Sequence, residues 1–330
     1  MEISMAGNSV PFAQLLEGVA TTDGKEAAGI MRPTTVVSGG NTDMPPGNYG
    51  KTNSDTQPAD ASNWRLLPVK GTATGEGENK RIRWSGAHAV KRGAGHRNNS
   101  LRNLIGAGGS GVVFHDGTVT FPMQATDDDG KSVLLAMQFT SSDNKWRLSY
   151  GTTDSGCRDP SVVEWGAGNK LILMSSCGEG QHQLYMSDGH GTSWCPNCVP
   201  INCVWCNSHD REGYGVPSGS TTAVIGDERV MLATLPAYSK DNERGRLHLW
   251  VTSSVRVHGV GPIPREGDEA AISSLLVKGN NDGLISLHES KKRSEGRSHG
   301  RVAFARGGGA GAGKRGGEEM DSFGQRLAIM

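Results

Sequence analysis

The run SGVVFHDGTVTFPMQ at residues 110–124, followed by SVLLAMQF at 132–139, decides the fold class. Its apolar stretches are short and rich in β-branched and aromatic residues, which is typical of strands. Asp-Gly pairs at 116–117 and 129–130 stand between these stretches, and Asp-Gly favours the tight turns that join antiparallel strands. The run therefore predicts consecutive β-hairpins.

The same pattern continues on both sides of this run, from residue 30 to residue 289, with no sustained helical periodicity. The other clear strand-like stretches are 64–70, 81–84, 161–165, 170–176, 182–187, 220–225, 229–236, 246–253, 272–278 and 283–289. Many short strands at roughly even spacing, in a chain with 48 glycines, favour a sandwich, barrel or propeller. We therefore expect an all-β fold.

The charge balance excludes some kinds of partner. Lys plus Arg and Asp plus Glu both total 34, so no excess of positive charge favours nucleic acid or an anionic membrane surface. No stretch approaches the roughly 18 consecutive apolar residues that a membrane helix needs. The N-terminus has no recognisable signal peptide, and the C-terminus has no hydrophobic anchor signal. We expect neither a nucleic-acid partner nor a membrane span.

The patterning divides the chain into three parts. Residues 1–28 are weakly patterned and stay unassigned, whereas 29–290 form the predicted β domain. Residues 291–330 are basic and rich in glycine with one short apolar run, so we expect them to be disordered. A basic binding segment and frameshifted coding sequence are both open interpretations of that tail.

Several collinear motifs resemble the trypanosomal trans-sialidase superfamily. They include CRDPSVVEW (157–165), SDGHGTSW (187–194), NSHDREGYGVPSG (207–219) and GRLHLWVTS (245–253). The resemblance covers roughly residues 30–290 and is strongest to the surface-glycoprotein branches, many of which are adhesins rather than enzymes. It implies a six-bladed sialidase-type β-propeller around a central pocket. Because neither the family's first blade nor its C-terminal lectin-like sandwich is matched, we expect the propeller to be incomplete.

The stretch 187–194 resembles the family's Asp-box, a turn of the form S-x-D-x-G-x-T-W between blade strands. Ser187, Gly191 and Trp194 keep the spacing, but Gly189 stands where the aspartate belongs. The resemblance implies a structural turn whose tryptophan packs between strands, without a catalytic role.

Sialidase chemistry needs a specific set of side chains. Three arginines clamp the sugar carboxylate, because the planar guanidinium matches a carboxylate bidentately. A tyrosine acts as the nucleophile, a glutamate takes its proton, and an aspartate is the general acid/base. The resemblance places Arg244 at one clamp position and Asp159 at the glutamate position. Arg32 stands where active members carry an aspartate that contacts the N-acyl group.

Other key positions are replaced. The resemblance implies that Ser176 stands at a second clamp arginine, Ile272 at the nucleophilic tyrosine and Asn242 at the acceptor-site tryptophan of trans-sialidases. Isoleucine cannot form a covalent glycosyl intermediate, and loss of a nucleophile costs orders of magnitude in rate. We expect negligible hydrolysis and no transfer, and the family implies no cofactor or metal.

Cys157 and Cys177 flank the hairpin formed by 161–165 and 170–176. They fall opposite each other across its turn, give or take one residue, so a cross-strand disulfide is plausible in an oxidising compartment. In a reducing compartment they are two thiols.

Two further cysteine pairs stand close together. The pairs Cys195-x-x-Cys198 and Cys203-x-x-Cys206 supply four thiolates, the ligand set of a structural zinc site. The spacer between the pairs is short for zinc, and the family carries arginine and glycine at the second pair. Drift or adventitious disulfides are the competing interpretation, and we expect no metal.

Three hypotheses of function follow. The first is an inactive surface glycoprotein that binds sialylated glycans or host surface and matrix proteins, and the resemblance implies display at the cell surface. The second is an active exo-α-sialidase that cleaves terminal sialic acid. The third is a decayed gene product without a stable fold. Ile272 and Ser176 separate the first from the second, and cooperative unfolding would exclude the third.

Overall fold

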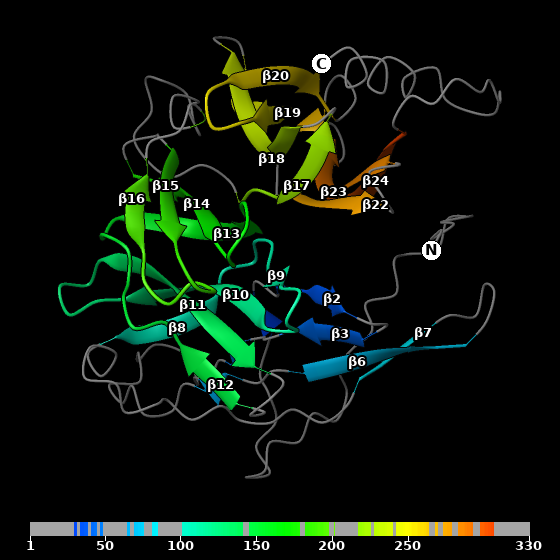
Figure 1. Cartoon of the computed structure of the whole chain (residues 1–330). Helices are drawn as coiled ribbons and strands as arrows, with labels where there is room; N and C mark the ends of the chain where they lie inside the picture. The colour runs from blue at the N-terminus through cyan, green and yellow to red at the C-terminus, as the bar shows by residue number, and fades with distance from the viewer. Residues whose placement is uncertain are drawn as a thin grey trace, which may run out of the picture.

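The structure is a computed structural model, and its regular elements are β-strands (Figure 1). It describes residues 30–31, 34–38, 41–44, 47–48, 65–66, 69–75, 81–84, 101–140, 145–178, 182–197, 201, 217–225, 228–239, 242–263, 268–269, 273–278, 283–292 and 298–306. Within these ranges no helix is long and apolar enough to cross a membrane. The expected all-β class is confirmed.

Five antiparallel sheets follow one another along the described chain. Sheet 1 contains β2 (Val36–Ser38), β3 (Asn41–Met44), β6 (Val69–Thr74) and β7 (Arg81–Trp84). Sheet 2 contains β8 (Arg102–Gly106), β9 (Val112–Val113), β10 (Val119–Thr126), β11 (Ser132–Thr140) and β12 (Lys145–Leu148). Sheet 3 contains β13 (Cys157–Glu164), β14 (Leu171–Cys177), β15 (His182–Ser187) and β16 (Cys195–Asn197).

Sheet 4 contains β17 (Ser220–Ile225), β18 (Glu228–Ser239), β19 (Asn242–Thr252) and β20 (Val257–Pro262). Sheet 5 contains β21 (Asp268–Glu269), β22 (Ser273–Lys278), β23 (Gly283–Lys292) and β24 (Ser298–Arg306). A small separate sheet is formed by β1 (Ile30–Met31), β4 (Gly47–Asn48) and β5 (Arg65–Leu66). Short strands joined to their sequence neighbours in this way are the pattern of blades.

Consecutive sheets pack face to face through separate apolar layers. Strand β14 shows how, because its side chains alternate between two layers. Leu171 and Leu173 belong to the layer shared with sheet 2, whereas Ile172 and Met174 belong to the layer shared with sheet 4. All four are buried, and each contributes roughly 1.5–3 kcal/mol by leaving water.

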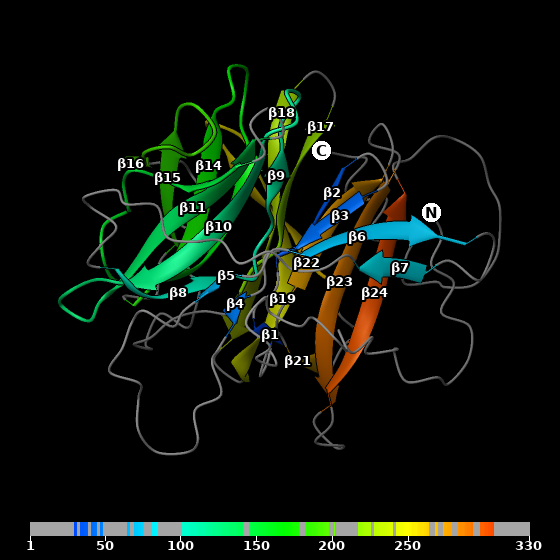
Figure 2. The ribbon, with the colours of Figure 1, turned by 90° about the horizontal axis from the view of Figure 1, so that it is seen from below.

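One strand of each sheet contacts one strand of the next sheet. Contacts join β2 to β9, β9 to β13, β13 to β17 and β17 to β22. Figure 2 shows the sheets fanning outward from these strands. The close approach requires glycine, because a Cβ on Gly109 would collide with the carbonyl oxygen of Pro160, and one on Gly219 with the backbone of Ser274.

The Asp-box stretch is a turn, as the sequence predicts. Gly189, His190 and Gly191 all have positive φ, and Thr192 Oγ1 donates to the Gly189 carbonyl oxygen at 2.8 Å. Trp194 is buried in the layer between sheets 2 and 3, where Gly191 packs against it. The altered motif therefore keeps its structural role.

A disulfide joins Cys157 and Cys177, which are direct cross-strand partners of β13 and β14. A second finding corrects an expectation. Residues 298–306, predicted to be disordered, form β24 and pair with β23 along nine positions. The short apolar run alone did not indicate a strand, because its register with β23, in which Phe304 pairs with Ile285 and Val302 with Leu287, is a tertiary property.

Candidate functional site

Buried hydroxyl groups form hydrogen bonds between neighbouring sheets, from the residue Ser110 before β9 in sheet 2 to β22 in sheet 5. The backbone N–H of Ser110 donates to Ser161 Oγ at 3.1 Å, and Ser161 Oγ hydrogen-bonds Ser220 Oγ. On the next sheet, Ser273 Oγ hydrogen-bonds Thr234 Oγ1 at 2.6 Å. We call these five residues the axial hydroxyl chain. It joins strands of neighbouring sheets to one another.

Two sequence-predicted site positions directly precede this chain. Asp159 lies two residues before Ser161, and Ile272 lies one residue before Ser273 but outside the described ranges. Sequence reasoning missed these hydroxyl residues; two of them, Ser220 and Ser273, are the first residues of β17 and β22.

Asp159 occupies an unusual backbone position. Its φ is +54°, in the left-handed region, and the β13–β14 register shifts between Arg158 and Ser161. The Asp159 N–H donates to Gln124 Oε1 at 3.1 Å, and the residue is only 8% exposed. A non-glycine residue held there costs of order 1–3 kcal/mol, and such bulges re-aim side chains near functional sites.

Ser176 lies at the same end of this strand pair as Asp159, on the neighbouring strand β14. It is 3% exposed, opposite Arg158 on β13 and His182 on β15. Burial lowers the pKa of His182 to about 4, although its contact with the Ser175 carbonyl oxygen opposes this. His182 is therefore neutral at pH 7, and Ser176 is itself uncharged.

The remaining predicted positions are only partly described. Asn242 and Arg244 belong to β19, where Asn242 pairs with Ser239 beside the β18–β19 turn; the description there covers the backbone. Arg32 lies outside the described ranges, as does Ile272. Among the predicted site residues, the structure therefore describes the side-chain surroundings of Asp159 and Ser176.

The structure describes one of the four cysteines of the hypothetical zinc site. Cys195 is an exposed free thiol, and the other three cysteines of the two pairs are not among the described residues. Within the described ranges, no group of three or more His, Cys, Asp or Glu residues could hold a metal ion.

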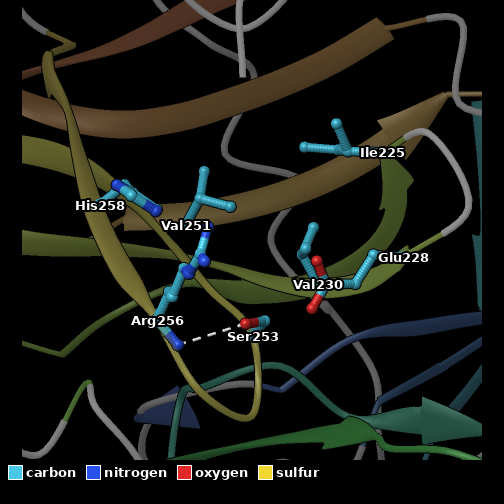
Figure 3. A pocket seen from close by; sticks show the side chains of 7 residues that line it. All are labelled: Ile225, Glu228, Val230, Val251, Ser253, Arg256 and His258. Atoms are coloured by element: carbon cyan, nitrogen blue, oxygen red, sulfur yellow. Dashed lines mark hydrogen bonds between the residues drawn. The ribbon is translucent and has the colours of Figure 1, made fainter.

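A separate hollow of about 360 Å³ lies at sheet 4 (Figure 3). It is lined by Ile225, Glu228, Val230, Val251, Ser253, Arg256 and His258. These residues come from the β17–β18 turn and from the strands joined by the β19–β20 turn. No sequence motif pointed to this hollow, because its lining residues are isolated in sequence and typical of strand ends.

Comparisons with known proteins identify the family to which most of this chain is similar. A family model described as BNR repeat-like domain matches residues 7–289, beginning 22 residues before the expected boundary at 29. A Trypanosoma cruzi protein named "Sialidase" is 28% identical over 269 residues, covering 79% of this chain and 23% of the relative. Another, "Sialidase 85-1.1" from the same organism, is 31% identical over 170 residues, covering 49% and 22%.

Solved structures agree with this. Trypanosoma rangeli sialidase in complex with sialic acid matches with a TM-score of 0.72 and 28% identity, covering 83% of this chain and 44% of that one. The microbial sialidase Hz136 shares the fold, with a TM-score of 0.60 at 15% identity. The chain spans about a quarter of the length of the curated relatives. It has the sialidase β-propeller fold and belongs to the BNR repeat-like domain family, within the sialidase and trans-sialidase superfamily.

Proposed function

We propose that this chain is a non-catalytic member of the superfamily that binds sialylated glycans at a cell surface. The observation that carries the proposal is the surroundings of Ser176. A buried serine, beside a histidine that is neutral at pH 7, stands where active members place a clamp arginine. A hydroxyl offers one hydrogen bond where a guanidinium offers two charge-assisted bonds to a carboxylate.

Loss of the nucleophile supports the same conclusion. Trypanosoma rangeli sialidase has been captured with 2,3-difluorosialic acid as a covalent intermediate. In this chain the matching position is Ile272, whose hydrocarbon side chain cannot attack a sugar carbon. The resulting loss in rate is expected to span orders of magnitude.

The residues that remain suit binding. In this proposal Arg244 attracts the sugar carboxylate, and Arg32 adds a second cation near the N-acyl group. Asp159 has no tyrosine proton to accept and instead acts as a hydrogen-bond acceptor for a ligand hydroxyl group. We assign the binding domain to residues 29–290, and host surface or matrix proteins that carry sialylated glycans are the proposed partners.

The test combines turnover with rescue. The purified chain and an Ile272→Tyr/Ser176→Arg double variant are each given a fluorogenic sialoside. We expect no turnover by the unmodified chain, and any activity is confined to the double variant. Turnover by the unmodified chain that a sialic-acid transition-state analogue abolishes would contradict the proposal.

A second arm tests binding separately. Surface plasmon resonance with immobilised sialyllactose should show saturable binding that Arg244→Ala weakens at least tenfold. Arg102→Ala is the matched control, because Arg102 is exposed on β8 in sheet 2 and should leave binding unchanged. Equal losses in both variants would indicate nonspecific charge attraction.

Active exo-α-sialidase is the alternative function. It is favoured by the names of the similar proteins and by the acid retained at Asp159. The turnover assay decides between the two directly.

A further inference from the structure

The hollow at sheet 4 lies far from the axial hydroxyl chain. Ser220 begins β17 and belongs to that chain, whereas Ile225 ends β17 and lines the hollow. Five residue steps along a strand span roughly 17 Å. The hollow is therefore distinct from the place where Asp159 lies.

Its floor is apolar and firmly held. Val230 and Val251 are 6% and 4% exposed and belong to the apolar layer between sheets 4 and 5. Ile225 packs against the same layer. A volume of about 360 Å³ falls at the small end of the range typical of ligand pockets. The floor therefore suits a small aliphatic group.

A buried hydroxyl stands at one side. Ser253 is 7% exposed, and its Oγ accepts the backbone N–H groups of Val255 and Arg256, both at 3.3 Å. No hydrogen bond donated by this hydroxyl is found among the described residues, so its proton is available to a ligand. Figure 3 shows Ser253 between Arg256 and Val230.

Opposite charges flank the floor. Arg256 and His258 lie on one side of the hollow and Glu228 on the other (Figure 3). Glu228 and Arg256 are both exposed, and no ion pair joins them in the described part of the chain, so both can pair with a ligand. A ligand between them needs an anionic group towards Arg256 and Ser253, and a cationic group towards Glu228.

We propose that this hollow binds a free α-amino acid with an aliphatic side chain. The carboxylate meets the Arg256 guanidinium and the Ser253 hydroxyl, the ammonium group meets Glu228, and the side chain lies on Val230 and Val251. A simple anion of the same size is disfavoured by Glu228, and a simple amine by Arg256.

The experiment is isothermal titration of the full chain with L-leucine. We expect saturable binding with a Kd below about 1 mM. The same titration uses 4-methylpentanoate, which lacks the ammonium group, 3-methylbutylamine, which lacks the carboxylate, and glycine, which lacks the side chain. Each should bind at least tenfold more weakly than leucine.

Variants assign the contacts. Glu228→Gln should weaken leucine at least tenfold while leaving 4-methylpentanoate unchanged or tighter. Arg229→Gln is the matched control, because Arg229 is exposed next to Glu228 in sequence and does not line the hollow. Circular dichroism checks that both variants are folded. Absence of saturable leucine binding, or equal leucine binding by the wild-type chain and Glu228→Gln, would overturn the proposal.

Discussion

The two ends of β17 are built on different principles. At its beginning, Ser220 lies in a buried contact between strands, where glycine and small hydroxyl residues let backbones touch. At its end, Ile225 borders a hollow with charged residues at its edge. Hydrogen bonds hold the residues at the first end. The five residues of the axial hydroxyl chain carry no charged side chain. The second has a hollow edged by exposed charged side chains, and no ion pair joins Glu228 to Arg256 among the described residues.

The largest expected effect comes from adding a side-chain atom at Gly109, where the backbones of neighbouring sheets approach closely. In Gly109→Ala the added Cβ would meet the backbone of Pro160, which cannot move like a side chain. We expect a loss of about 3 kcal/mol in the free energy of unfolding, measured by urea denaturation. Gly151→Ala is the control, because its Cβ would find its nearest neighbours at 3.8 Å and should change stability by less than about 0.5 kcal/mol. Similar losses in both variants would mean that the sheets do not approach so closely.

The second effect depends on pH. Burial lowers the folded-state pKa of His182 to about 4, whereas the unfolded value is about 6.5. Between these values the unfolded chain binds the proton and the folded chain does not, so stability falls as the pH drops from 6.5 towards 4. The total loss should reach a few kcal/mol.

His182→Gln should flatten this pH dependence, measured by urea denaturation at several pH values. His115→Gln, which replaces an exposed histidine, should leave it unchanged. If His182→Gln kept the slope of the wild-type chain, the imidazole would not be buried in the folded state.

The smallest effect tests the hydroxyl chain. Ser161→Ala removes the acceptor of the Ser110 N–H and the partner of Ser220 Oγ, and it should cost about 1–2 kcal/mol. Ser274→Ala, at an exposed position on β22, should cost less than about 0.5 kcal/mol. Thermal unfolding of the two variants side by side measures the difference, and equal melting temperatures would show that the linkage adds no stability.

Much of the fold could be predicted from sequence because it is local. Asp-Gly turns and alternating apolar residues specify hairpins such as β10–β11, and the position of Cys157 and Cys177 across a hairpin indicated their disulfide. The strand β24 could not be predicted, since its stability depends on pairing with β23. Its short apolar run carries too little information alone.

The sequence could predict which residues belong to the candidate site, but it could not predict their geometry. Motif matching located Asp159 and Ser176, yet nothing in the sequence indicated the left-handed backbone of Asp159 or the neutral histidine beside Ser176. Both properties arise from neighbours distant in sequence or from burial. The charged hollow was missed for the same reason, because its walls come from different strands.

The central claim is that the propeller binds sialylated glycans without cleaving them. A titration of α2,3-sialyllactose with the purified chain, followed by proton NMR, observes both events in one tube. We predict saturable broadening of the sialic acid signals and no free lactose after prolonged incubation. Release of lactose, or the absence of any change in the sialic acid signals, would contradict the account.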